Sequence, residues 1–531
     1  MRALRRRDWL AGAAALAALP RRARAVGAPL YRRGNDADPE TLDPHRSSTV
    51  AEAHILRDLF EGLLTYDNRG AIIPGAAERW TISEDRRTYT FRLRADGRWS
   101  NGEPVEAGAF VYALRRILAP ATAAKYAEVL FPIRNAAAVN AGALPADRLG
   151  VTAPDARTLV IALDNPTPYL LELLTHQTSL PVHPPTVERF GDAFTRPGNL
   201  VSNGPYLLRD LVPNDRISLA RNPHFHAAAS VAIPEVAFLP TPDLASAVRR
   251  YAAGEIDSLA DLPGDQMAAL KARFGDQVVL GPGLGLYALA VNTHKAPFSD
   301  PRVRRALSLA IDRPYLAEAL WGGTMSPAWS FCPPGLDNYR APPETEGRQG
   351  YPIDHEAEAR RLLAEAGFGP GRPLRVEYRF NTTDNNRNTA VALAEMWREL
   401  GIETRFVYTD AKTHFAYLRD GGDFDIARMS WIADYSDPQN FLFLLRSGND
   451  GMNPGRFADA GYDALLDAAA REPDVAARAD LLWRAEAILM RDLPWIPVMH
   501  TRSKALISPR LHGYHPNLRN AAPTRFLRLE G

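Results

Sequence analysis

Cysteine is nearly absent from this chain, with Cys332 as the one example in 531 residues. A single cysteine excludes an internal disulfide, and it also excludes a C-x-x-C motif. Long apolar runs are missing as well, because no stretch beyond the first 25 residues is long enough to cross a bilayer. Those residues are not followed by a cysteine, so we expect no lipid anchor of the lipoprotein type.

A strong net charge is missing too. The chain has 63 basic and 62 acidic residues, a formal net charge of +1. Seven of the basic residues and one of the acidic residues lie in the first 25 positions, so the remainder carries 56 and 61, a net charge of −5. That balance argues against nucleic acid or an anionic membrane as a partner. A hydrophobic content of 46% and a length sufficient for two or three domains are typical of a soluble globular protein.

The first 25 residues have the pattern of a secretory signal peptide. Arginines precede a short apolar stretch from Trp9 to Leu19, and a small-x-small sequence ends at Ala25. Arg6 and Arg7 precede large apolar residues as in the twin-arginine consensus, although a general secretory leader with incidental arginines fits the same residues. We therefore expect residues 1–25 to be removed and the mature chain to be free in the periplasm.

Catalytic and cofactor motifs are also lacking. The chain has no G-x-S-x-G elbow, no G-x-x-x-x-G-K-[ST] loop and no H-E-x-x-H zinc helix. His355 and Glu356 begin like such a helix, but no second histidine follows at the required spacing, which indicates an exposed helix start. The glycines of GPGLGLY, residues 281–287, are out of order for a dinucleotide loop, and a strand is expected next, which indicates a crossover or a hinge. We expect no catalysis, no cofactor and no metal.

Helical and extended patterns alternate along the chain, which predicts an α/β fold. Alternating apolar and polar residues predict strands at 87–94 and 157–163, and a further strand is expected at 403–408. Apolar periodicity and capping residues predict helices at 107–118, 300–312, 354–368 and 389–402. The second of these begins with Asp300 as N-cap and Pro301 at the first helical position.

The segment DIARMSWIADYSDPQNF, residues 425–441, places an acid among large aromatic residues. Asp434 follows Trp431 and Ala433 and precedes Tyr435. A lone carboxylate in such surroundings is costly to desolvate unless a cation meets it. The pattern therefore predicts either a site that receives a cation or an aspartate that caps a helix or pairs internally.

Several blocks of the sequence carry a family resemblance. They include ADPETLDPHRSSTVAEAHILRDLFEGLLTYD, VSNGPYLL and DFDIARMSWIADYSDPQNF. Their order resembles that of periplasmic solute-binding proteins of the oligopeptide-binding class, over about residues 30–530. The W-S-x-G-x-P-V run at 99–105 marks the wider family, which also includes dipeptide, nickel and glutathione binders, whereas the W-x-A-D-Y block narrows the resemblance to oligopeptides.

The resemblance implies an α/β fold of the type II periplasmic-binding-protein kind, with two lobes around a hinged cleft plus an inserted third domain. The implied divisions are a signal peptide (1–25), lobe I (26–60, 184–284 and 502–531), inserted domain II (61–183) and lobe III (285–501). A ligand would lie between lobes I and III, which close on a hinge. The protein, expected as a monomer, would deliver that ligand to an inner-membrane ABC permease and its ATPase subunits.

The resemblance also implies roles for individual residues. Asp434 has the position of the family aspartate that pairs with the free α-ammonium of a bound peptide. Arg428 and Arg419 match positions that face the site, where either could receive a peptide carboxylate or pair with Asp434, although Arg419 could equally be a surface arginine. The ligand backbone would pair with Ser48, Thr49 and Val50 on one side and beside Trp431 and Ala433 on the other.

Three positions depart from the family pattern. Trp321 stands where a lysine is expected, Asn386 where a histidine is expected, and Lys412 where a tryptophan is expected. The expected lysine and histidine serve the carboxylates of ligands of different length, so the preferred length stays open, although Lys412 could restore one cation. An oligopeptide is the expected ligand, with a dipeptide, murein peptide, opine or glutathione as alternatives. A peptide holdase is a further alternative, and a hydrolase would be supported only by turnover of a bound peptide.

Overall fold

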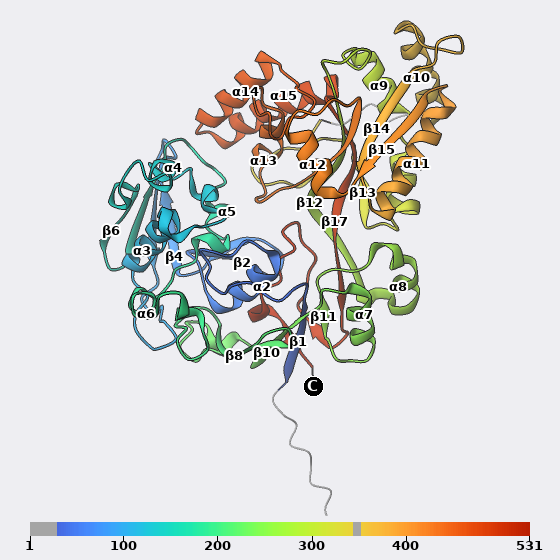
Figure 1. Cartoon of the computed structure of the whole chain (residues 1–531). Coiled ribbons are helices and arrows are strands. Elements are labelled where there is room, and N and C mark those ends of the chain that lie inside the picture. Colours follow the sequence, from blue (N-terminus) through green and yellow to red (C-terminus); the bar gives the residue numbers. More distant parts are fainter. Residues whose placement is uncertain (1–28, 344–351, 531) are drawn as a thin grey trace, which may run out of the picture.

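The computed structural model describes residues 29–343 and 352–530, so the expected signal peptide at 1–25 lies outside the described residues. Figure 1 shows lobe III at the top, lobe I at the bottom and inserted domain II, in blue and cyan, at the left. Two long strands, β12 and β17, join the bottom to the top. The architecture is a mixed α/β fold.

The largest sheet has eleven strands and runs through both lobes. Its order is β15-β14-β16-β12-β17-β11-β1-β10-β9-β8, with β13 paired to β17 at the side. Strand β14 runs parallel to β15 and β16, and β1 runs parallel to β10 and β11, while the other pairs are antiparallel. The strands are β1 (Leu30–Asn35), β8 (Tyr206–Val212), β9 (Arg216–Arg221), β10 (Glu235–Pro240), β11 (Ser258–Leu259), β12 (Val278–Val291), β13 (Met325–Pro327), β14 (Arg375–Asn381), β15 (Glu403–Thr409), β16 (Ile426–Ile432) and β17 (Trp495–Ile507).

Strands β12 and β17 belong to both lobes. The first half of β12 pairs with the last half of β17 in lobe I, and the opposite halves pair in lobe III, where β12 also pairs with β16. The register of the two strands shifts between Pro282 and Leu286. A Cβ atom on Gly283 would lie 2.8 Å from the carbonyl oxygen of Thr501, so this close crossing needs glycine. The segment 281–287 is thus part of β12 itself, at the crossing between the lobes.

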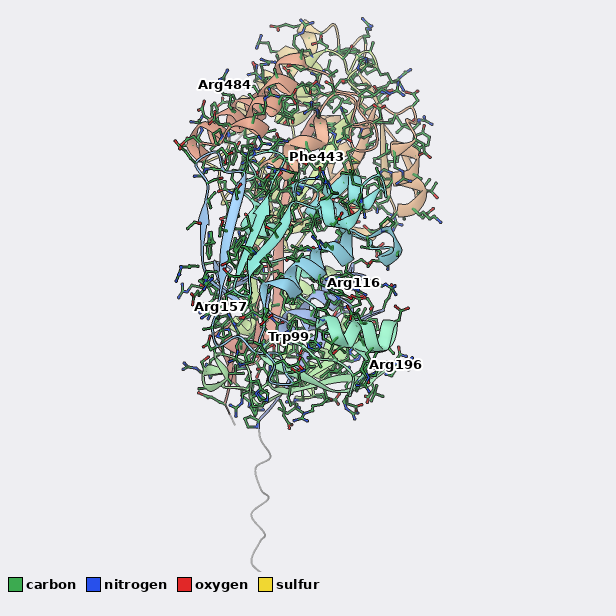
Figure 2. The ribbon with its side chains drawn as sticks, turned by 90° about the vertical axis from the view of Figure 1, so that its left-hand side faces the viewer. Trp99, Arg116, Arg157, Arg196, Phe443 and Arg484 are labelled. Atoms are coloured by element: carbon green, nitrogen blue, oxygen red, sulfur yellow. The ribbon has the colours of Figure 1, made fainter. Side chains whose placement is uncertain are left out.

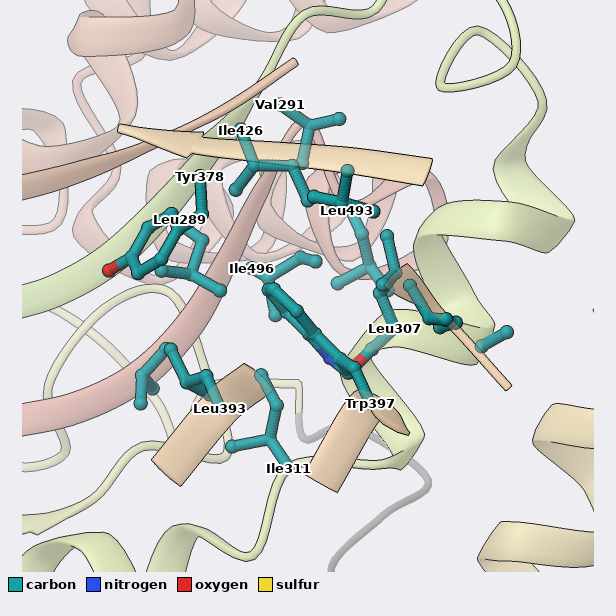
Figure 3. Close-up of a cluster of buried hydrophobic side chains, with 14 of the residues drawn as sticks. Leu289, Val291, Leu307, Ile311, Tyr378, Leu393, Trp397, Ile426, Leu493 and Ile496 are labelled. Carbon is teal, nitrogen blue, oxygen red and sulfur yellow. The ribbon is translucent and has the colours of Figure 1, made fainter. Parts of the chain in front are cut away.

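Helices cover both faces of the sheet in lobe III. Successive residues of β12 point to opposite faces, so Leu289 lies in a core with α9 and α11 whereas Ala288 lies in a core with α14 and α15. Figure 3 shows the first core, in which the indole N–H of Trp397 donates to the Leu307 carbonyl at 3.1 Å. The helices are α9 (Pro301–Leu309), α10 (Pro352–Glu365), α11 (Asp384–Glu399), α12 (Ala411–Arg419), α13 (Gln439–Leu442), α14 (Ala460–Arg471) and α15 (Val475–Asp492).

Domain II has its own four-stranded antiparallel sheet, of order β4-β5-β7-β6. Helix α3 packs on it, and buried Phe91 and Phe110 share one core with Trp99. The elements are β2 (Leu64–Tyr66), β3 (Ile72–Pro74), β4 (Ala77–Ile82), β5 (Thr88–Leu93), α3 (Ala107–Leu118), α4 (Ala136–Asn140), β6 (Val151–Asp155), β7 (Thr158–Ala162) and α5 (Leu170–Leu173), with α6 (Pro184–Phe190) after them.

Lobe I takes its core from distant parts of the chain. Tyr31, Leu56, Tyr206 and Ala505 lie in one buried cluster, although they come from β1, α2, β8 and β17. The remaining elements are α2 (Val50–Leu59), α7 (Leu244–Ala252), α8 (Met267–Phe274), β18 (Leu511–His512) and β19 (Arg528–Leu529). Lobe I therefore cannot form from one continuous stretch of sequence.

Most helices and strands confirm the sequence patterns. Helix α3 covers the predicted 107–118, and α9 begins at Pro301 with Asp300 as its N-cap. Strands β5 and β7 fall within the predicted 87–94 and 157–163. Helix α11 begins at Asp384, earlier than the predicted 389, because the Thr383 side chain accepts a hydrogen bond from the Asn386 amide and so caps it.

Candidate functional site

Within the described part of the chain, one edge of β16 has no partner strand just before Asp434. Strand β14 pairs with β16 at Ile426 and Ala427, and the pairing stops there, while β12 follows β16 along its other edge up to Ile432. Successive residues of a strand direct their amide groups to opposite edges. The Ala433 N–H donates to Leu284 on the β12 side at 2.8 Å, so the amide groups of Ser430 and Ile432 face the open edge.

Asp434 follows this strand directly and has no cation. Within residues 29–343 and 352–530, no hydrogen bond or ion pair is formed by its exposed carboxylate. Partial desolvation, with the negative charge of Glu128 as a second cause, raises the pKa of Asp434. Glu128 belongs to a short 3₁₀ helix of domain II, so a carboxylate of one body faces a carboxylate of another. A cation placed here would relieve both unfavourable effects.

Trp431 lies on β16, three residues before Asp434. Its indole N–H donates to the Asn440 side-chain oxygen at 2.9 Å, and its ring meets the edge of Phe443 with centroids 5.8 Å apart. Figure 2, turned so that domain II faces the viewer, shows Phe443 where lobe III meets that domain. These two contacts with Asn440 and Phe443 fix the position of the half-buried indole. Ala433, the other residue expected here, is buried.

Arg428 provides a cation on the same strand. Its guanidinium lies 5.0 Å from the ring centre of Tyr287 and 5.6 Å from that of Phe415. One Nη donates to the Asn381 side-chain oxygen at 3.2 Å, while the buried Nε has no partner among the described residues. No carboxylate in the described parts of the chain pairs with this guanidinium, Asp434 included. A poorly hydrated, uncompensated cation of this kind favours an anionic ligand group.

Asn386 and Trp321, two of the residues that differ from the family pattern, contact neighbours of Arg428. The buried Asn386 side chain donates to Asn381, the residue that also binds Arg428, at 2.9 Å and 3.2 Å. The Trp321 indole N–H donates to the Thr389 hydroxyl at 2.9 Å. The Trp321 ring meets the Tyr287 ring edge-on at 5.9 Å. The structure therefore joins Asn386 and Trp321 to Arg428 through shared neighbours.

Lys412 and Arg419 are not joined to this group. Both lie on α12, where Lys412 is exposed in the first turn and Arg419 is the last residue. Arg419 pairs with Asp420 at 3.9 Å, and its side chain is 61% exposed. Lys412 forms no ion pair within the part of the chain that the structure describes. Neither residue interacts with Asp434 or Arg428 in this conformation.

On lobe I, the expected backbone segment forms the start of α2. Thr49 is extended and caps the helix, and the Glu52 carboxylate accepts from the N–H groups of Ser48 and Thr49 at 2.8 Å and 3.0 Å. A ligand would therefore form hydrogen bonds with the side chains of these residues or donate to the Ser48 carbonyl oxygen. Val50 is 60% exposed, and Ile432 of lobe III is 70% exposed. Both lobes thus present uncovered apolar side chains next to polar groups.

Two contacts beside Asp434 were not foreseen from the sequence. Tyr169 of domain II stacks on Tyr435, and the buried Asp437 carboxylate binds Arg478 at 2.9 Å and 2.8 Å. The Arg478 guanidinium in turn lies 5.5 Å from the Tyr169 ring centre. Asp437 belongs to the conspicuous 425–441 segment, but nothing in the sequence marks a partner so far along the chain.

A cavity of about 360 Å³ lies behind these contacts, between domain II and lobe III. Its lining includes Phe131, Pro166 and Tyr169 from domain II and Phe443, Leu466 and Arg478 from lobe III. Among the residues described, no group of three or more His, Cys, Asp or Glu side chains could hold a metal ion. The helices within that same part of the chain include none that is long and apolar enough to span a membrane.

Comparison with known proteins gives a consistent relationship. The periplasmic murein peptide-binding protein MppA of Escherichia coli (strain K12) is 38% identical over 483 residues, covering 90% of this chain and 89% of that protein. The periplasmic oligopeptide-binding protein OppA of Salmonella typhimurium is 37% identical over 486 residues, covering 91% and 89%. Each share is large enough for the likeness to hold along nearly the whole of both chains.

Solved structures agree with this relationship. The unliganded open form of MppA superposes with a TM-score of 0.87 at 36% identity, over 95% of this chain and 98% of that one. A second MppA structure reaches 0.73, and OppA of Haemophilus influenzae in complex with RPPGFSPFR reaches 0.72 at 33% identity. The superposition with that complex covers 95% of this chain and 99% of the OppA chain. The lobes here are therefore arranged as in the open form.

The family model that matches describes the middle part of bacterial extracellular solute-binding proteins, family 5, and it covers residues 71–453. This range includes most of domain II, the strand β12 and the segment with Arg428 and Asp434. The match extends over more than half of the chain, and the relatives extend it towards both ends. The chain belongs to the bacterial extracellular solute-binding proteins, family 5.

Proposed function

We propose that this protein is the periplasmic solute-binding component of an ATP-driven importer and that its ligands are oligopeptides. Two of its relatives are named for binding oligopeptides or murein peptide in the periplasm, and a third is a structure of such a protein with RPPGFSPFR. The protein would close around a peptide and deliver it to an inner-membrane permease with its ATPase subunits. It would act as a monomer and release the peptide unaltered.

The observation that carries this proposal is the arrangement of Asp434 at the end of the open edge of β16. A carboxylate without a cation suits the α-ammonium of a peptide N-terminus. The amide groups of Ser430 and Ile432 suit a peptide backbone that adds to the edge as a further strand. Both features recognise what all peptides share, so neither requires a particular sequence.

Arg428 supports a peptide ligand by its opposite charge. Its guanidinium is fixed over Tyr287 and has no carboxylate partner among the described residues. A peptide carboxylate would supply that partner and would be bound strongly in these poorly hydrated surroundings. A ligand with an ammonium at one end and a carboxylate further along would satisfy both Asp434 and Arg428.

Murein peptide is the second candidate ligand. The likeness to MppA is 38% identity in sequence and a TM-score of 0.87 in structure. Among the described residues, Arg428 has no carboxylate partner, so an acidic group of such a ligand would meet an uncompensated cation there. Binding of a murein tripeptide in preference to ordinary tripeptides would favour this candidate.

Thermal melting with added ligand tests the proposal. Pools of tri-, tetra- and pentapeptides are compared with the same pools after N-acetylation, and a murein tripeptide is added as a further sample. Ligand at a hundred times its Kd stabilises the folded chain by about 2.7 kcal/mol, which gives a clear rise in Tm. We expect a rise with free peptides that acetylation abolishes. No rise with any sample would contradict the peptide proposal, and mass spectrometry of the recovered peptide would show any hydrolysis.

For export, we propose that residues 1–25 act as a twin-arginine signal. Arg6 and Arg7 support it by their place before Trp9 and Leu10. The arginines at 21, 22 and 24, after the apolar stretch, suit that route better than the general secretory one.

A further inference from the structure

Arg519 lies where the three bodies of the protein meet. It belongs to the C-terminal junction, defined here as residues 513–521, which follows the last strand of the large sheet. Its Nε and Nη2 donate to the Glu172 carboxylate of domain II at 2.7–2.9 Å, and its Nη1 donates to the Gly70 carbonyl at 2.9 Å. The Tyr66 ring lies 5.3 Å below the guanidinium, and its hydroxyl donates to the same Glu172 at 2.9 Å. Arg519 is therefore fixed to domain II.

The same guanidinium reaches lobe III. Its Nη2 also forms an ion pair with the Asp337 carboxylate, which belongs to a loop of lobe III. Arg519 is 12% exposed and Asp337 is 48% exposed in their side chains. One arginine thus binds a buried carboxylate of domain II and a more accessible carboxylate of lobe III at once.

The loop around Asp337 is bound to the segment that carries Asp434. The Asp337 N–H donates to the Ser436 hydroxyl at 3.1 Å, and the Asn338 side chain donates to Asp437 at 3.4 Å. Asp437 is itself held by Arg478 in a buried ion pair. Asp337 and Asp434 therefore move together when lobe III moves.

We propose that the Asp337–Arg519 ion pair is a latch that favours the open arrangement of the lobes and so lowers the affinity for ligand. The arrangement seen here is the open one, by its likeness to the unliganded open form of MppA. Arg519 is fixed to domain II by Glu172 and Gly70, so it cannot follow lobe III when that lobe turns about β12 and β17. Closure must therefore break or rebuild the contact with Asp337.

The consequence for affinity follows from linkage. A ligand that binds only the closed arrangement has an apparent Kd equal to its intrinsic Kd divided by the closed fraction, so a larger open fraction raises the apparent Kd. Any interaction made only in the open arrangement adds to that fraction. The latch is independent of the ligand's identity, so it stands apart from the proposed peptide function.

Asp337→Asn is a mild change by which to test the latch. Arg519 keeps Glu172 as a partner, so the variant leaves no buried charge unpaired, and the introduced amide can retain the loop's shape. The matched control is Asp480→Asn, which removes the Arg340–Asp480 ion pair at 3.3 Å. That pair involves the same loop and similar exposure, but both of its residues lie in lobe III.

The first measurement uses no ligand. Single-molecule energy transfer between dyes on Glu84→Cys in domain II and Arg471→Cys in lobe III, both exposed positions, reports the closed fraction. Cys332 is fully buried, so dyes should attach to the introduced cysteines. We expect Asp337→Asn to raise the ratio of closed to open molecules about two- to fivefold, as for a partly exposed ion pair, and Asp480→Asn to leave it unchanged. An unchanged or lower ratio in Asp337→Asn would overturn the latch.

The second measurement adds tri-alanine as a probe. We expect its Kd to be lowered by the same factor in Asp337→Asn, and an unchanged or raised Kd there would overturn the latch. We also expect 1 M NaCl to raise the closed fraction of the wild type more than that of Asp337→Asn, because salt screens the pair. Failure of tri-alanine to bind the wild type would count against the peptide function alone, since the dye measurement decides the latch without it.

Discussion

The rings of Tyr169 and Tyr435 stack with their centres 4.6 Å apart and an angle of 7° between their planes. Tyr169 belongs to domain II, and Tyr435 comes directly after Asp434 in lobe III. The stack therefore places the residue next to Asp434 at the boundary between domain II and lobe III. Besides partial desolvation, the negative charge of Glu128 raises the pKa of Asp434, so domain II influences the charge of this candidate site.

Replacement of Asp434 by asparagine should weaken binding of free peptides. We expect a loss of about 1.5–3 kcal/mol, typical of a hydrogen bond between charged groups, in isothermal titration with tri-alanine. Acetylation of the peptide should cost the wild type a similar amount and cost Asp434→Asn little more, because both changes remove one interaction. Asp420→Asn, an exposed aspartate of the same lobe, is the control. Equal acetylation costs in wild type and Asp434→Asn would remove Asp434 from the site.

The pKa of Asp434 should make affinity depend on pH. Its pKa is raised in the free protein and should fall when an ammonium binds, so only the ionised form binds well. Affinity should therefore rise with pH between the two pKa values, by at most about tenfold per pH unit, and level off above the raised value. Glu128→Gln removes the neighbouring negative charge and should move this rise to lower pH. A profile that is the same in wild type, Glu128→Gln and Asp434→Asn would contradict the assignment.

Trp321 should limit the length of the ligand. Its ring covers the edge of Tyr287, on which Arg428 is placed, so Trp321→Ala should open space next to that cation. We expect the affinity for tetra- and pentapeptides to rise relative to that for tripeptides, measured by titration with each length. Trp483→Ala, a half-buried tryptophan on α15, is the control. An unchanged preference in Trp321→Ala would show that length is set elsewhere.

Glu486 should make the stability of the protein depend on pH. Burial raises its pKa from an ordinary 4.5 to about 7, although the Cys332 N–H and the Tyr339 hydroxyl donate to it at 2.8 Å and 2.5 Å. Between these values the folded chain holds a proton that the unfolded chain releases. The free energy of unfolding therefore falls as pH rises, by on the order of 3 kcal/mol in total.

Glu486→Gln removes this titration. The free energy of unfolding of the variant minus that of the wild type should therefore be larger at pH 7.5 than at pH 4.5. Urea denaturation at both pH values measures the difference. Glu399→Gln, on the exposed end of α11, should show no such gain. A constant difference between wild type and Glu486→Gln at the two pH values would contradict the raised pKa.

Replacement of Arg6 and Arg7 by lysine should block export. A twin-arginine signal depends on the two guanidinium groups, so charge alone should not suffice. Cell fractionation of the double variant should find the protein retained inside the cell. Arg2→Lys with Arg5→Lys keeps the pair intact and serves as the control. Periplasmic arrival of both variants would favour the general secretory route.

Local patterns in the sequence predicted local structure well. The apolar spacing of 107–118 and the capping pair Asp300 and Pro301 were sufficient, because their causes lie within one helix. The start of α11 was missed because the polar residues 384–388 show no apolar periodicity, although Thr383 caps them. The glycines of 281–287 could only be explained by the structure, since the neighbours that demand them lie far along the chain: Thr501 for Gly283 and Gly285, and Ser503 and Pro516 for Gly281.

The residues proposed for the candidate site differ in how far the sequence could place them. Asp434, Trp431 and Arg428 lie on one short segment, so the resemblance could place them together. Lys412 and Arg419 depend on how α12 is oriented, and neither interacts with Asp434 among the described residues. The ion pairs Asp437–Arg478 and Asp337–Arg519 join residues far apart in sequence, so no local sequence pattern predicts them.

Strand β17 has a consequence for how the chain is made. It lies near the middle of the large sheet, between β12 and β11, yet it is the last strand of that sheet to leave the ribosome. Until residues 495–507 emerge, β12 lacks its main partner and lobe I lacks one side of its core. The nascent chain must therefore wait for its final segment before either lobe is complete, and a premature stop ahead of Trp495 would leave both halves without a centre.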